Sequence, residues 1–592
     1  MRTAAASAGA TRQRPPRFLV AGGVTMKEYQ ARWYGGCAPG SGIATTPVGA
    51  RLLWKDPALW VSGDWRTTHV RTLELGAARI AVLGPCAATE QELASALSCP
   101  DLASAAGFWD GSHTVVRTSG GGTVEVLADA AGSSPLYLVN TADGVVWGSS
   151  SFALSPLAGG NVDTEWIAAY LREKYAPATK RSAWSGVKPV PAGHMLTLGS
   201  PLGPTSSAWW ARVRRTPGEA SAALRRALGE GVRVRVEGVS ATTDLAGMDS
   251  TTVALLAAQH GTITGVTLHP SGVANGGDMR YARALVTPGL DHRFFPLDAR
   301  HLPFASTDLP LPATDEPAPS TPVWSMFSEQ LGLTASAGMP CHLTGDGGDN
   351  LFLSAPTHLG SLARHGHWWR MFRDAMDWSR LRRLSPGPLI VAACRSGTAH
   401  VGRPARPCPA WLMAPVPDAN TTVATDPDTA FVTSLRTVAR SAYAEVQLAD
   451  ALGVALHNPY FDGTVLDAVV SAPIELRYSA RRYKPMLVDT FSDLLPEAHR
   501  KRAAKGLFVG DFHQGLRVNL PRVLGLADKR LAALGIIAPV PLTKAMHAAA
   551  LGARTVWPSL LSAVATEEWL EAVENAPKTT WTRTAVFPAG AQ

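Results

Sequence analysis

The chain has 592 residues, of which 46% are hydrophobic and 17% charged, and this composition excludes a disordered or fibrous protein. One hydrophobic core cannot serve a chain of this length, so two or more domains are expected. The formal net charge of +8 suits an anionic ligand such as a nucleotide, but over so large a surface it singles out no partner.

The sequence predicts neither a membrane span nor an export signal. No window approaches the roughly 18 consecutive apolar residues of a spanning helix. The Ala- and Arg-rich start, Met1 to Arg17, lacks the apolar core of a signal peptide. The six cysteines show no metal-finger spacing and suit a reducing compartment. We therefore expect a cytoplasmic protein.

The first 210 residues predict a β-rich domain. Residues 1–16 are expected to be disordered, and Arg17 to Val24 is the first expected strand. Up to about residue 200, short segments of alternating polarity are separated by Gly, Pro, Ser and Asn, and a helix is expected at Asp163 to Tyr175. This pattern is typical of antiparallel strands, so we expect an antiparallel β-sandwich over residues 17–210. The clearest strand segments are residues 113–120, 122–129, 134–140 and 144–150.

From about residue 211, short apolar strands alternate with helices. The expected strands cover residues 239–245, 263–268 and 341–345, and the expected helices cover residues 217–230, 250–259 and 279–286. This alternation predicts a parallel, doubly wound sheet. Beyond residue 355 the pattern is largely helical, so we expect residues 211–592 to form one α/β domain with a helical C-terminal part.

A first polar motif, Asp244 to Thr252, follows a predicted strand and opens a helix. Ligands bind at this edge of an open α/β sheet. Small residues at Ala246 and Gly247 let backbone N–H groups approach a phosphate, and the positive end of the helix attracts the anion. Asp249 can hold Mg²⁺. The loop is not a Walker A sequence, because the Gly-Lys-Ser ending is missing, and taken alone it fits an ordinary helix N-cap equally well.

A second polar motif, His342 to Asn350, follows another predicted strand. Three glycines and two aspartates within residues 345–350 give a backbone that is costly to order. Such loops usually allow the close approach of a ligand, and a plain turn is the alternative. Asp349 could complete a Mg²⁺ site with Asp249, and Asp346 could face the reacting atoms.

The two motifs together resemble the asparagine synthetase superfamily. Residues 245–250 resemble its pyrophosphate loop, and residues 344–349 resemble its second nucleotide-and-metal loop. Asn458 to Asp462 resembles a downstream family segment, and Arg502 to Phe508 resembles the segment that holds the catalytic lysine, here Lys505. In the β-rich half, residues 129–137 and 147–150 resemble the family's class II glutamine amidotransferase domain. The resemblance therefore covers nearly the whole chain, in the right order.

Within this superfamily the sequence most resembles the lasso peptide macrolactam synthetases. The Gly-Asp-Gly-Gly-Asp loop, the preceding Asp315-Glu-Pro317 and the stretch Tyr483-Lys-Pro-Met-Leu487 are typical of them. The resemblance implies ATP and Mg²⁺ as cofactors and a core peptide as substrate. It also implies a leader peptidase and a leader-recognition protein as partners, and no nucleic acid.

The sequence departs from the family pattern at several positions. Leu245 and Ala246 replace the usual Ser and Gly, so Ser250 or the backbone must supply a phosphate donor, and Asn350 stands where Glu is common. A class II glutaminase needs Cys as the first residue of the mature chain, because its own α-amine serves as the base. This chain opens Met-Arg-Thr and its first cysteine is Cys37, so we expect no glutaminase activity and a substrate that brings its own amine.

The resemblance implies a reaction in two steps. A substrate carboxylate first attacks the α-phosphorus of ATP, and an amine then attacks the acyl adenylate. We expect Asp346 to accept the amine proton and Lys505 to stabilise the developing charge, although Lys505 lies in a basic run and could be a solvated surface residue. Tyr443 or Glu445 could support Asp346, and the sequence does not choose between them.

The expected contacts follow from the same resemblance. Asp249 and Asp349 are expected to hold the metal. The expected nucleotide and pyrophosphate contacts are Leu245, Ala246, Gly247, Asp249, Ser250, Leu268, Thr344 and Gly345.

Two other functions stay open from the sequence. One is another amide-forming synthetase of the superfamily, either a small-molecule β-lactam synthetase or a synthetase fed by free ammonia. The other is a non-catalytic homologue that binds nucleotide or peptide, and the departures from the family pattern at Leu245 and Asn350 favour it. The three aspartates of the two loops, together with Lys505, argue against that second alternative.

A basic stretch, Arg364 to Arg383, contains three tryptophans and has no assigned role. Interleaved basic and aromatic residues can grip a peptide or a nucleic acid. An amphipathic helix face is the simpler interpretation and the one we expect.

Overall fold

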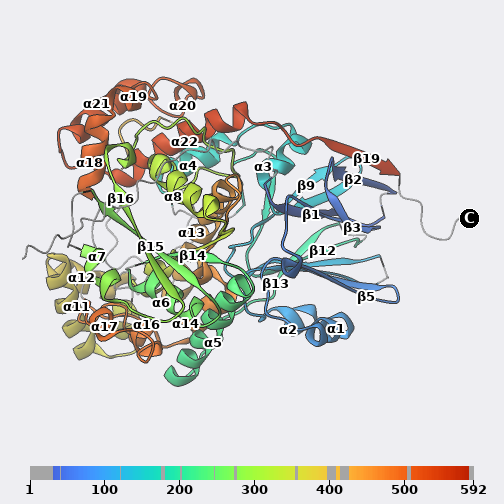
Figure 1. Cartoon of the computed structure of the whole chain (residues 1–592), viewed down its shortest axis with the longest axis horizontal. Coiled ribbons are helices and arrows are strands. Elements are labelled where there is room, and N and C mark those ends of the chain that lie inside the picture. Colours follow the sequence, from blue (N-terminus) through green and yellow to red (C-terminus); the bar gives the residue numbers. More distant parts are fainter. Residues whose placement is uncertain are drawn as a thin grey trace, which may run out of the picture.

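The computed structural model of the chain describes residues 31–40, 42–119, 122–174, 180–200, 203–245, 247–271, 277–353, 358–396, 408–413, 426–502 and 509–585. Two parts lie side by side, a β-rich part from the first 210 residues and a larger part with the helices around a central sheet (Figure 1). The strand predicted at Arg17 to Val24 lies outside the described residues.

Twelve described strands of the β-rich part form two antiparallel sheets. The first sheet contains β1 (Trp33–Cys37), β3 (Arg51–Lys55), β4 (Ala58–Ser62), β9 (Leu136–Thr141), β10 (Gly144–Gly148) and β11 (Lys188–Val190). The second contains β5 (Val70–Leu75), β6 (Ala78–Leu83), β7 (Thr114–Thr118), β8 (Val124–Leu127), β12 (His194–Leu198) and β13 (Thr205–Ala208). Their orders are β11-β9-β10-β1-β4-β3 and β13-β12-β8-β7-β6-β5.

The two antiparallel sheets share one core. Trp147 of the first sheet and Val126 of the second belong to the same buried cluster, so the predicted antiparallel architecture is confirmed in outline. The large rings demand a small neighbour. A Cβ on Gly35 would lie 2.3 Å from the carbonyl oxygen of Trp147 and 2.9 Å from the ring of Trp60, so only glycine fits there.

Short helices flank these sheets, namely α1 (Glu90–Ser98), α2 (Leu102–Ala106), α3 (Ser151–Leu154) and α4 (Thr164–Arg172). The prediction for α4 placed its start one residue early. Asp163 caps this helix, because its side chain accepts a hydrogen bond of 2.9 Å from the backbone N–H of Trp166.

The second part is built around a five-stranded sheet in which every strand pair is parallel. Its strands are β14 (Ala241–Asp244), β15 (Ile263–Pro270), β16 (Leu290–Leu297), β17 (Cys341–Leu343) and β18 (Ala455–His457), in the order β16-β15-β14-β17-β18. Starting from the central strand β14, the sheet adds β15 and β16 on one side and β17 and β18 on the other. The predicted parallel sheet is confirmed, and its chain order reverses between β14 and β17.

Helices cover both faces of the parallel sheet. On one face, α5 (Pro217–Val236), α6 (Met248–Ala257) and α14 (Gly463–Ser471) pack in one buried cluster with Leu343 of β17. On the other face, α8 (Trp324–Ser336) and α13 (Pro427–Asp450) pack against Leu456 of β18. Between β15 and β16 lies α7 (Gly277–Ala284). The apolar strands therefore reflect burial from both sides.

The chain beyond residue 355 is largely helical, as predicted. Just before this stretch lies α9 (Gly348–Phe352). The remaining helices of the stretch are α10 (His358–Arg364), α11 (Trp368–Arg382), α12 (Pro386–Ser396), α15 (Ile474–Arg477), α16 (Pro485–Thr490), α17 (Glu497–Arg500), α18 (Val509–Val518), α19 (Leu520–Leu524), α20 (Arg530–Ala533), α21 (Pro539–Ala550) and α22 (Trp557–Asn575). In the described part of the chain no helix combines the length and apolarity that crossing a membrane requires.

The last strand, β19 (Trp581–Ala585), returns to the β-rich part and pairs antiparallel with β2 (Ile43–Pro47). Trp581 packs there with its ring centroid 5.8 Å from that of Trp33 and 5.9 Å from that of Trp60. Residues about 540 positions apart thus form one layer at the right of Figure 1.

Candidate active site

The two polar motifs lie next to each other at the point where the strand order reverses. The first leaves β14 and the second leaves β17, and these strands are direct neighbours. A Cβ on Gly345 would lie 2.7 Å from the backbone nitrogen of Ser250, and one on Gly348 would lie 2.3 Å from Asp249 Cγ. These two glycines are therefore required because the loops pack on each other, which the sequence pattern alone did not indicate.

The first motif forms the N-terminus of α6, at the edge of the sheet where the parallel strands end. Gly247 is the N-cap and provides no side-chain cap, so the first-turn N–H groups are directed at whatever lies beyond the helix end. Asp249 and Ser250 occupy this turn and are 7% and 8% exposed. The helix begins two residues earlier than predicted, and Ala246 lies outside the described residues.

Leu245 belongs to the core of the sheet. Its backbone N–H donates to the carbonyl oxygen of Val266 at 2.9 Å, and its carbonyl accepts from Thr267 Oγ1 at 3.3 Å. Its side chain packs against Gly265, where a Cβ would lie 2.8 Å from Leu245 Cδ2. The leucine that replaces the usual serine thus fills space under the loop.

Asp249 and Asp349 converge on one buried ammonium group. Lys484 Nζ contacts the carboxylates of both residues, and the lysine side chain is fully buried. This lysine caps α16 in a left-handed conformation with a φ of 46°, which directs it back toward the two loops. The stretch Tyr483 to Leu487 contributed to the family resemblance, but no sequence pattern predicted that Lys484 contacts Asp249 and Asp349.

The two carboxylates that meet at Lys484 are the pair predicted to hold the metal. Mg²⁺ is usually held by one or two carboxylates together with substrate phosphates, and Asp249 and Asp349 supply that number. Within the described residues no group of three or more His, Cys, Asp or Glu side chains could hold a metal by itself. The donors therefore fit a Mg²⁺ that arrives with a nucleotide.

The segment Asn458 to Asp462 supports both loops. Tyr460 Oη donates a hydrogen bond of 3.1 Å to the backbone oxygen of Asp249. Thr344 Oγ1 donates to Asn458 Oδ1 at 2.6 Å and accepts from the backbone N–H of Asp346 at 3.0 Å.

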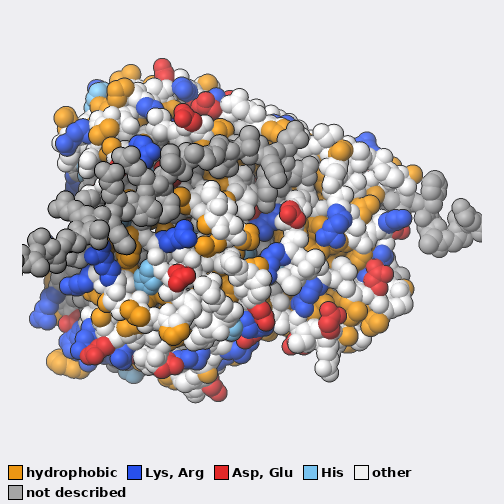
Figure 2. All heavy atoms as spheres, viewed as in Figure 1, with side chains coloured by type: hydrophobic (Ala, Val, Ile, Leu, Met, Phe, Trp, Pro, Cys, Tyr) orange, Lys and Arg blue, Asp and Glu red, His pale blue; other side chains and the backbone are white. Residues whose placement is uncertain are grey.

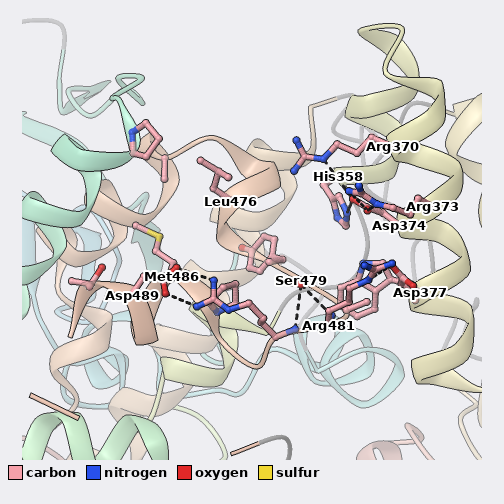
Figure 3. Close-up of a pocket in the computed structure, with 18 of the residues that line it drawn as sticks. His358, Arg370, Arg373, Asp374, Asp377, Leu476, Ser479, Arg481, Met486 and Asp489 are labelled. Carbon is pink, nitrogen blue, oxygen red and sulfur yellow. Dashed lines mark hydrogen bonds and ion pairs between the residues drawn. The ribbon is translucent and has the colours of Figure 1, made fainter. Parts of the chain in front are cut away.

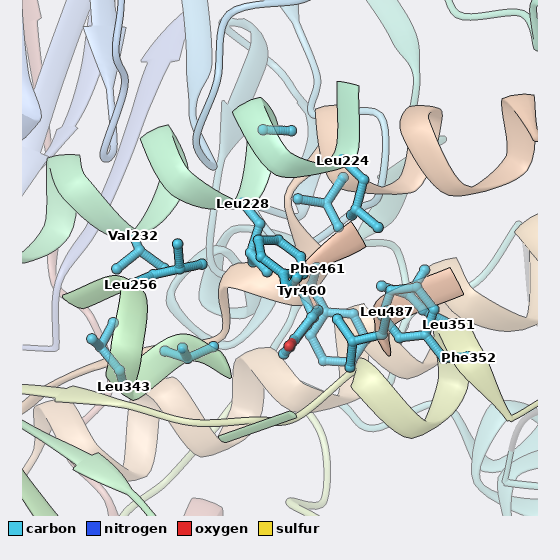
Figure 4. Close-up of a cluster of buried hydrophobic side chains, with 14 of the residues drawn as sticks. Leu224, Leu228, Val232, Leu256, Leu343, Leu351, Phe352, Tyr460, Phe461 and Leu487 are labelled. Carbon is cyan, nitrogen blue, oxygen red and sulfur yellow. The ribbon is translucent and has the colours of Figure 1, made fainter. Parts of the chain in front are cut away.

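Beneath the loops, an apolar cluster anchors the same segment. Tyr460 and Phe461 pack together with Leu351, Phe352 and Leu487, as Figure 4 shows. The resemblance of this segment to the family is therefore explained by support of the site.

Asp462 makes a different kind of contact. Arg235 of α5 donates to both of its oxygens, at 2.8 Å and 2.5 Å, and both side chains are buried. Burial raises the pKa of the Asp462 carboxyl to about 6, while Arg235 lowers it. This ion pair joins α5 to the start of α14 and lies away from the two loops' carboxylates.

The structure distinguishes Glu445 from Tyr443, which the sequence could not. Burial and, after it, the nearby charge of Asp346 together raise the pKa of the Glu445 carboxyl to about 8. The phenol of Tyr443 instead responds to Asp315 and Tyr34, on the side of the β-rich part. Of the two residues, Glu445 is therefore the one whose pKa depends on the charge of Asp346.

Lys174 brings a positive charge from the β-rich part toward the same carboxyl. Its charge lowers the pKa of Glu445, and Glu445 and Glu316 in turn oppose the lowering of the Lys174 pKa by burial. No sequence motif marked this lysine. It follows the last residue of α4 by two positions, and only the packing of the two parts brings its charge near Glu445.

Two other predicted contacts have different positions. Leu268 is half-buried in β15, beyond the first loop, where it pairs with Phe295. Lys505 lies outside the described residues. Just before it, Arg502 is buried, with its guanidinium carbon 4.7 Å from the ring centroid of Tyr281.

The Asp315-Glu-Pro317 stretch connects the two parts of the molecule. Asp315 accepts hydrogen bonds from Ser150 Oγ at 2.6 Å and from the backbone N–H of Phe152 at 2.8 Å. Glu316 accepts from Ser441 Oγ at 2.9 Å and pairs with Arg440 at 3.1 Å. Asp315 thus joins the two parts, whereas Glu316 pairs with residues of α13 in its own part.

Cys37 is a buried residue of β1. Its Sγ donates to the carbonyl oxygen of Thr45 at 3.2 Å, and burial raises the pKa of its thiol to about 11. A thiol with this pKa is protonated near neutral pH and is a poor nucleophile.

Comparison with known proteins agrees with this geometry. The asparagine synthase family model matches residues 223–571, which is more than half of the chain. No curated protein matches the sequence significantly. The matched range begins in α5, ends in α22 and includes both loops and Lys484. The chain therefore belongs to the asparagine synthase family, and is by that membership an ATP-dependent enzyme that forms carbon–nitrogen bonds.

Proposed function

We propose that the protein is an ATP-dependent macrolactam synthetase. It adenylates an Asp or Glu side-chain carboxylate of a core peptide and joins it to the N-terminal amine of the same peptide, as in lasso peptides. Pyrophosphate and AMP leave. The observation that carries this proposal is a single loop in which Asp349 contacts Lys484 beside Asp249, while the charge of Asp346, three residues earlier, raises the pKa of the Glu445 carboxyl.

In the first step, the substrate carboxylate attacks the α-phosphorus of ATP and the bond to pyrophosphate breaks. The first-turn N–H groups of α6 and Ser250 hold the pyrophosphate. Asp249 and Asp349 would hold Mg²⁺, which would supply charge neutralisation on the phosphates. Lys484 contacts both of these carboxylates and offsets part of their negative charge.

In the second step, the amine attacks the acyl carbon, a C–N bond forms and AMP leaves with the bonding electrons of the broken C–O bond. The ammonium proton passes to Asp346. Because Glu445 stays protonated near neutral pH, it does not compete as an anion, and Asp346 keeps the role of base. A peptide α-amine has a pKa of about 7.7 to 8.0, so a modest base is sufficient.

The amine comes from the substrate and not from glutamine. A glutaminase of the related class needs a reactive N-terminal thiolate, and Cys37 is buried with a protonated thiol. The β-rich part, whose sequence resembles a glutaminase domain, offers no such nucleophile among its described residues.

A large cavity favours a peptide over a small amino acid. About 970 Å³ lies between the two parts, lined by Phe152 and Trp33 on one side and by Phe304 and Trp324 on the other. Thr321 also lines it and directly follows Ser320, which lies beside Glu445. This volume is at the upper end of the range for small-ligand pockets, about 300 to 1,000 Å³. A leader peptidase and a leader-recognition protein remain proposed partners.

Incubation of the purified protein with ATP, Mg²⁺ and a candidate core peptide tests this function. The proposal predicts a peptide that has lost one water, by mass spectrometry, with an equal amount of AMP. Asp249→Ala should abolish both, and the exposed Asp528→Ala should change neither.

Other outcomes would replace the proposal. Release of AMP with small carboxylates only would assign a small-molecule synthetase. Amide formation that needs added ammonia would assign an ammonia-dependent enzyme. No AMP or pyrophosphate with any carboxylate, even with the partner proteins present, would leave a binding protein.

A further inference from the structure

A partly exposed carboxylate ends the central strand of the parallel sheet. Asp244 is the last residue of β14 and directly precedes the first loop. Its side chain is 39% exposed, whereas the three preceding residues of the strand are buried. The proposed reaction places the metal at Asp249 and Asp349, and within the described residues Asp244 completes no group of three with them that could hold a metal. The reaction as described so far gives Asp244 no role.

Two buried side chains hold this carboxylate in place. Gln330 of α8 donates a hydrogen bond of 2.9 Å from Nε2 to Asp244 Oδ1, and His342 Nε2 lies 3.3 Å from the same oxygen. Gln330 and His342 are 5% and 1% exposed. The other ring nitrogen of His342 lies 2.7 Å from Thr242 Oγ1, which fixes the imidazole. Both contacts use one oxygen of the carboxylate, and the second, Oδ2, makes no hydrogen bond within the described part of the chain.

A carboxylate in an ordinary ion pair has different surroundings. In the cavity of Figure 3, Asp377 of α11 accepts a hydrogen bond of 2.7 Å from Arg481. Among the described residues no Lys or Arg pairs with Asp244, and its ion-pair partner is His342. Lys and Arg side chains gather around α11 and α12, at the lower left of Figure 2, whereas β14 lies near the middle of the molecule in the same view (Figure 1). The basic stretch of the sequence forms α11, which buries one face as expected of an amphipathic helix.

The position of Asp244 indicates which part of ATP it would meet. Ligands of open α/β sheets bind outside the carboxyl ends of the strands where the strand order reverses, and β14 is such a strand. The residues that follow Asp244 lead to the N-terminus of α6, which would hold the phosphates. The ribose is joined directly to the α-phosphate, so it is the nearest part of ATP beyond the phosphates. Its hydroxyl groups donate hydrogen bonds, and an ionised carboxylate only accepts them.

We propose that Asp244 Oδ2 accepts a hydrogen bond from a ribose hydroxyl of ATP, so that this residue selects ribonucleotides. Gln330 and His342 are positioning residues, because they fix the other oxygen and direct the open one to the crevice. Acidic residues at strand ends contact ribose hydroxyls in dinucleotide-binding folds for the same physical reason. The proposal needs only an ATP-dependent enzyme and does not depend on a peptide substrate.

Calorimetry of nucleotide binding to the full chain, with Mg²⁺ and without any carboxylate substrate, tests the proposal. The probes are ATP, 2′-deoxy-ATP, 3′-deoxy-ATP and purine riboside triphosphate, which lacks the 6-amino group of ATP. At least one deoxy analogue should bind about tenfold more weakly than ATP, because a hydrogen bond to a charged acceptor is lost. Equal binding of ATP and both deoxy analogues overturns the proposal, as does the absence of ATP binding. Weaker binding of the purine analogue alone would place the contact at the base and also overturn it.

Variants locate the contact. In Asp244→Ala the preference for ATP over the sensitive deoxy analogue should disappear, and in Asp244→Asn it should fall, because a neutral acceptor is weaker. Gln330→Met, which removes the positioning amide, should also lower it. Asp291→Ala should keep it, because this exposed carboxylate lies near the start of β16, at the opposite edge of the sheet.

The preference is a ratio of two dissociation constants measured on one protein, so partial unfolding of a variant does not imitate the expected result. A preference that stays about tenfold in Asp244→Ala, or in Asp244→Asn where the alanine variant does not fold, would place the ribose elsewhere and overturn the assignment. Because no peptide is present, this binding assay can fail while macrolactam formation succeeds, and the reverse.

Discussion

Two buried contacts between a cation and carboxylates differ in their balance of charge. Arg235 meets one carboxylate, Asp462, through two hydrogen bonds, and both are enclosed. Lys484 meets two, and the Asp349 side chain is 40% exposed. The first contact joins one cation to one carboxylate, whereas in the second one cation bridges two carboxylates from different loops, one of them partly open to solvent. The difference indicates that burial alone does not mark a functional ion pair, and that two carboxylates gathered on one cation do.

The neighbours of the two contacts strengthen the distinction. Around Arg235, burial together with the surrounding arginines lowers the pKa of His69 to about 3 and that of His457 well below its usual value. Both imidazoles therefore stay neutral, and the Arg235–Asp462 pair keeps its balance over the physiological range.

The largest expected effect is on activity, from Asp249→Asn. Loss of a metal ligand should lower AMP formation by about 10²- to 10³-fold, the range seen when one transition-state charge contact is removed. The melting temperature should stay close to that of the wild type, because Asp349 still contacts Lys484 in the variant. Retained activity within tenfold would contradict the assignment of this contact as functional.

The next effect is on stability, from Asp462→Ala. Removing one partner of a buried pair leaves Arg235 uncompensated, which should cost about 3 to 5 kcal/mol of unfolding free energy. A shift of the guanidinium unfolding midpoint measures it. Glu497→Ala, which breaks the exposed pair with Lys501, is the control and should cost less than about 1 kcal/mol. Equal shifts would remove the contrast between the contacts.

Much of the architecture could be predicted from the sequence. The alternating segments around residues 113–150 gave four strands near their observed positions, because alternation in a half-buried sheet is a local property. Asp249 and Asp349 could be paired because parallel strands end at one edge of a sheet. The pairing of β19 with β2 could not, since nothing local relates strands so far apart in the chain.

Lys484→Met tests whether the ammonium group and Mg²⁺ share one position between the two carboxylates. Without its ammonium group, Asp249 and Asp349 repel each other, so the variant should melt a few degrees below the wild type. Mg²⁺ alone should recover part of that loss in the variant and have a smaller effect on the wild type. Lys501→Met, on the surface, should show neither change. A variant whose melting temperature does not change with Mg²⁺ would contradict a position shared by the metal and the ammonium group.

The residues around Asp346 show where sequence reasoning reached its limit. Tyr443 and Glu445 lie two positions apart on one helix, so they face different sides. Which side meets Asp346 depends on how α13 is rotated in the fold, and the sequence holds no local record of that rotation. The Asp315-Glu-Pro317 stretch was conspicuous for a related reason, because interface residues and site residues can be equally distinctive in a sequence.

The smallest expected effect is a change of slope with pH, from Glu445→Gln. The pKa of this carboxyl is raised from 4.5 to about 8, so between these values the folded protein holds a proton that the unfolded chain has lost. The contribution of Glu445 to stability therefore falls as pH rises through this window. The glutamine variant should lack that decline between pH 5 and 8. Glu497→Gln, which changes an exposed carboxyl, should keep it. Parallel profiles for all three proteins would contradict the burial of Glu445 as a neutral group.

Isotope transfer from the substrate carboxylate to AMP tests adenylation at this site most directly. A core peptide with ¹⁸O in both oxygens of its acceptor side-chain carboxylate is incubated with the protein, ATP and Mg²⁺. The mass of the AMP is then measured by mass spectrometry. Formation of an acyl adenylate followed by amine attack predicts one ¹⁸O atom in each AMP and a cyclised peptide that retains the other. Unlabelled AMP, or label found in inorganic phosphate beside ADP, would contradict it.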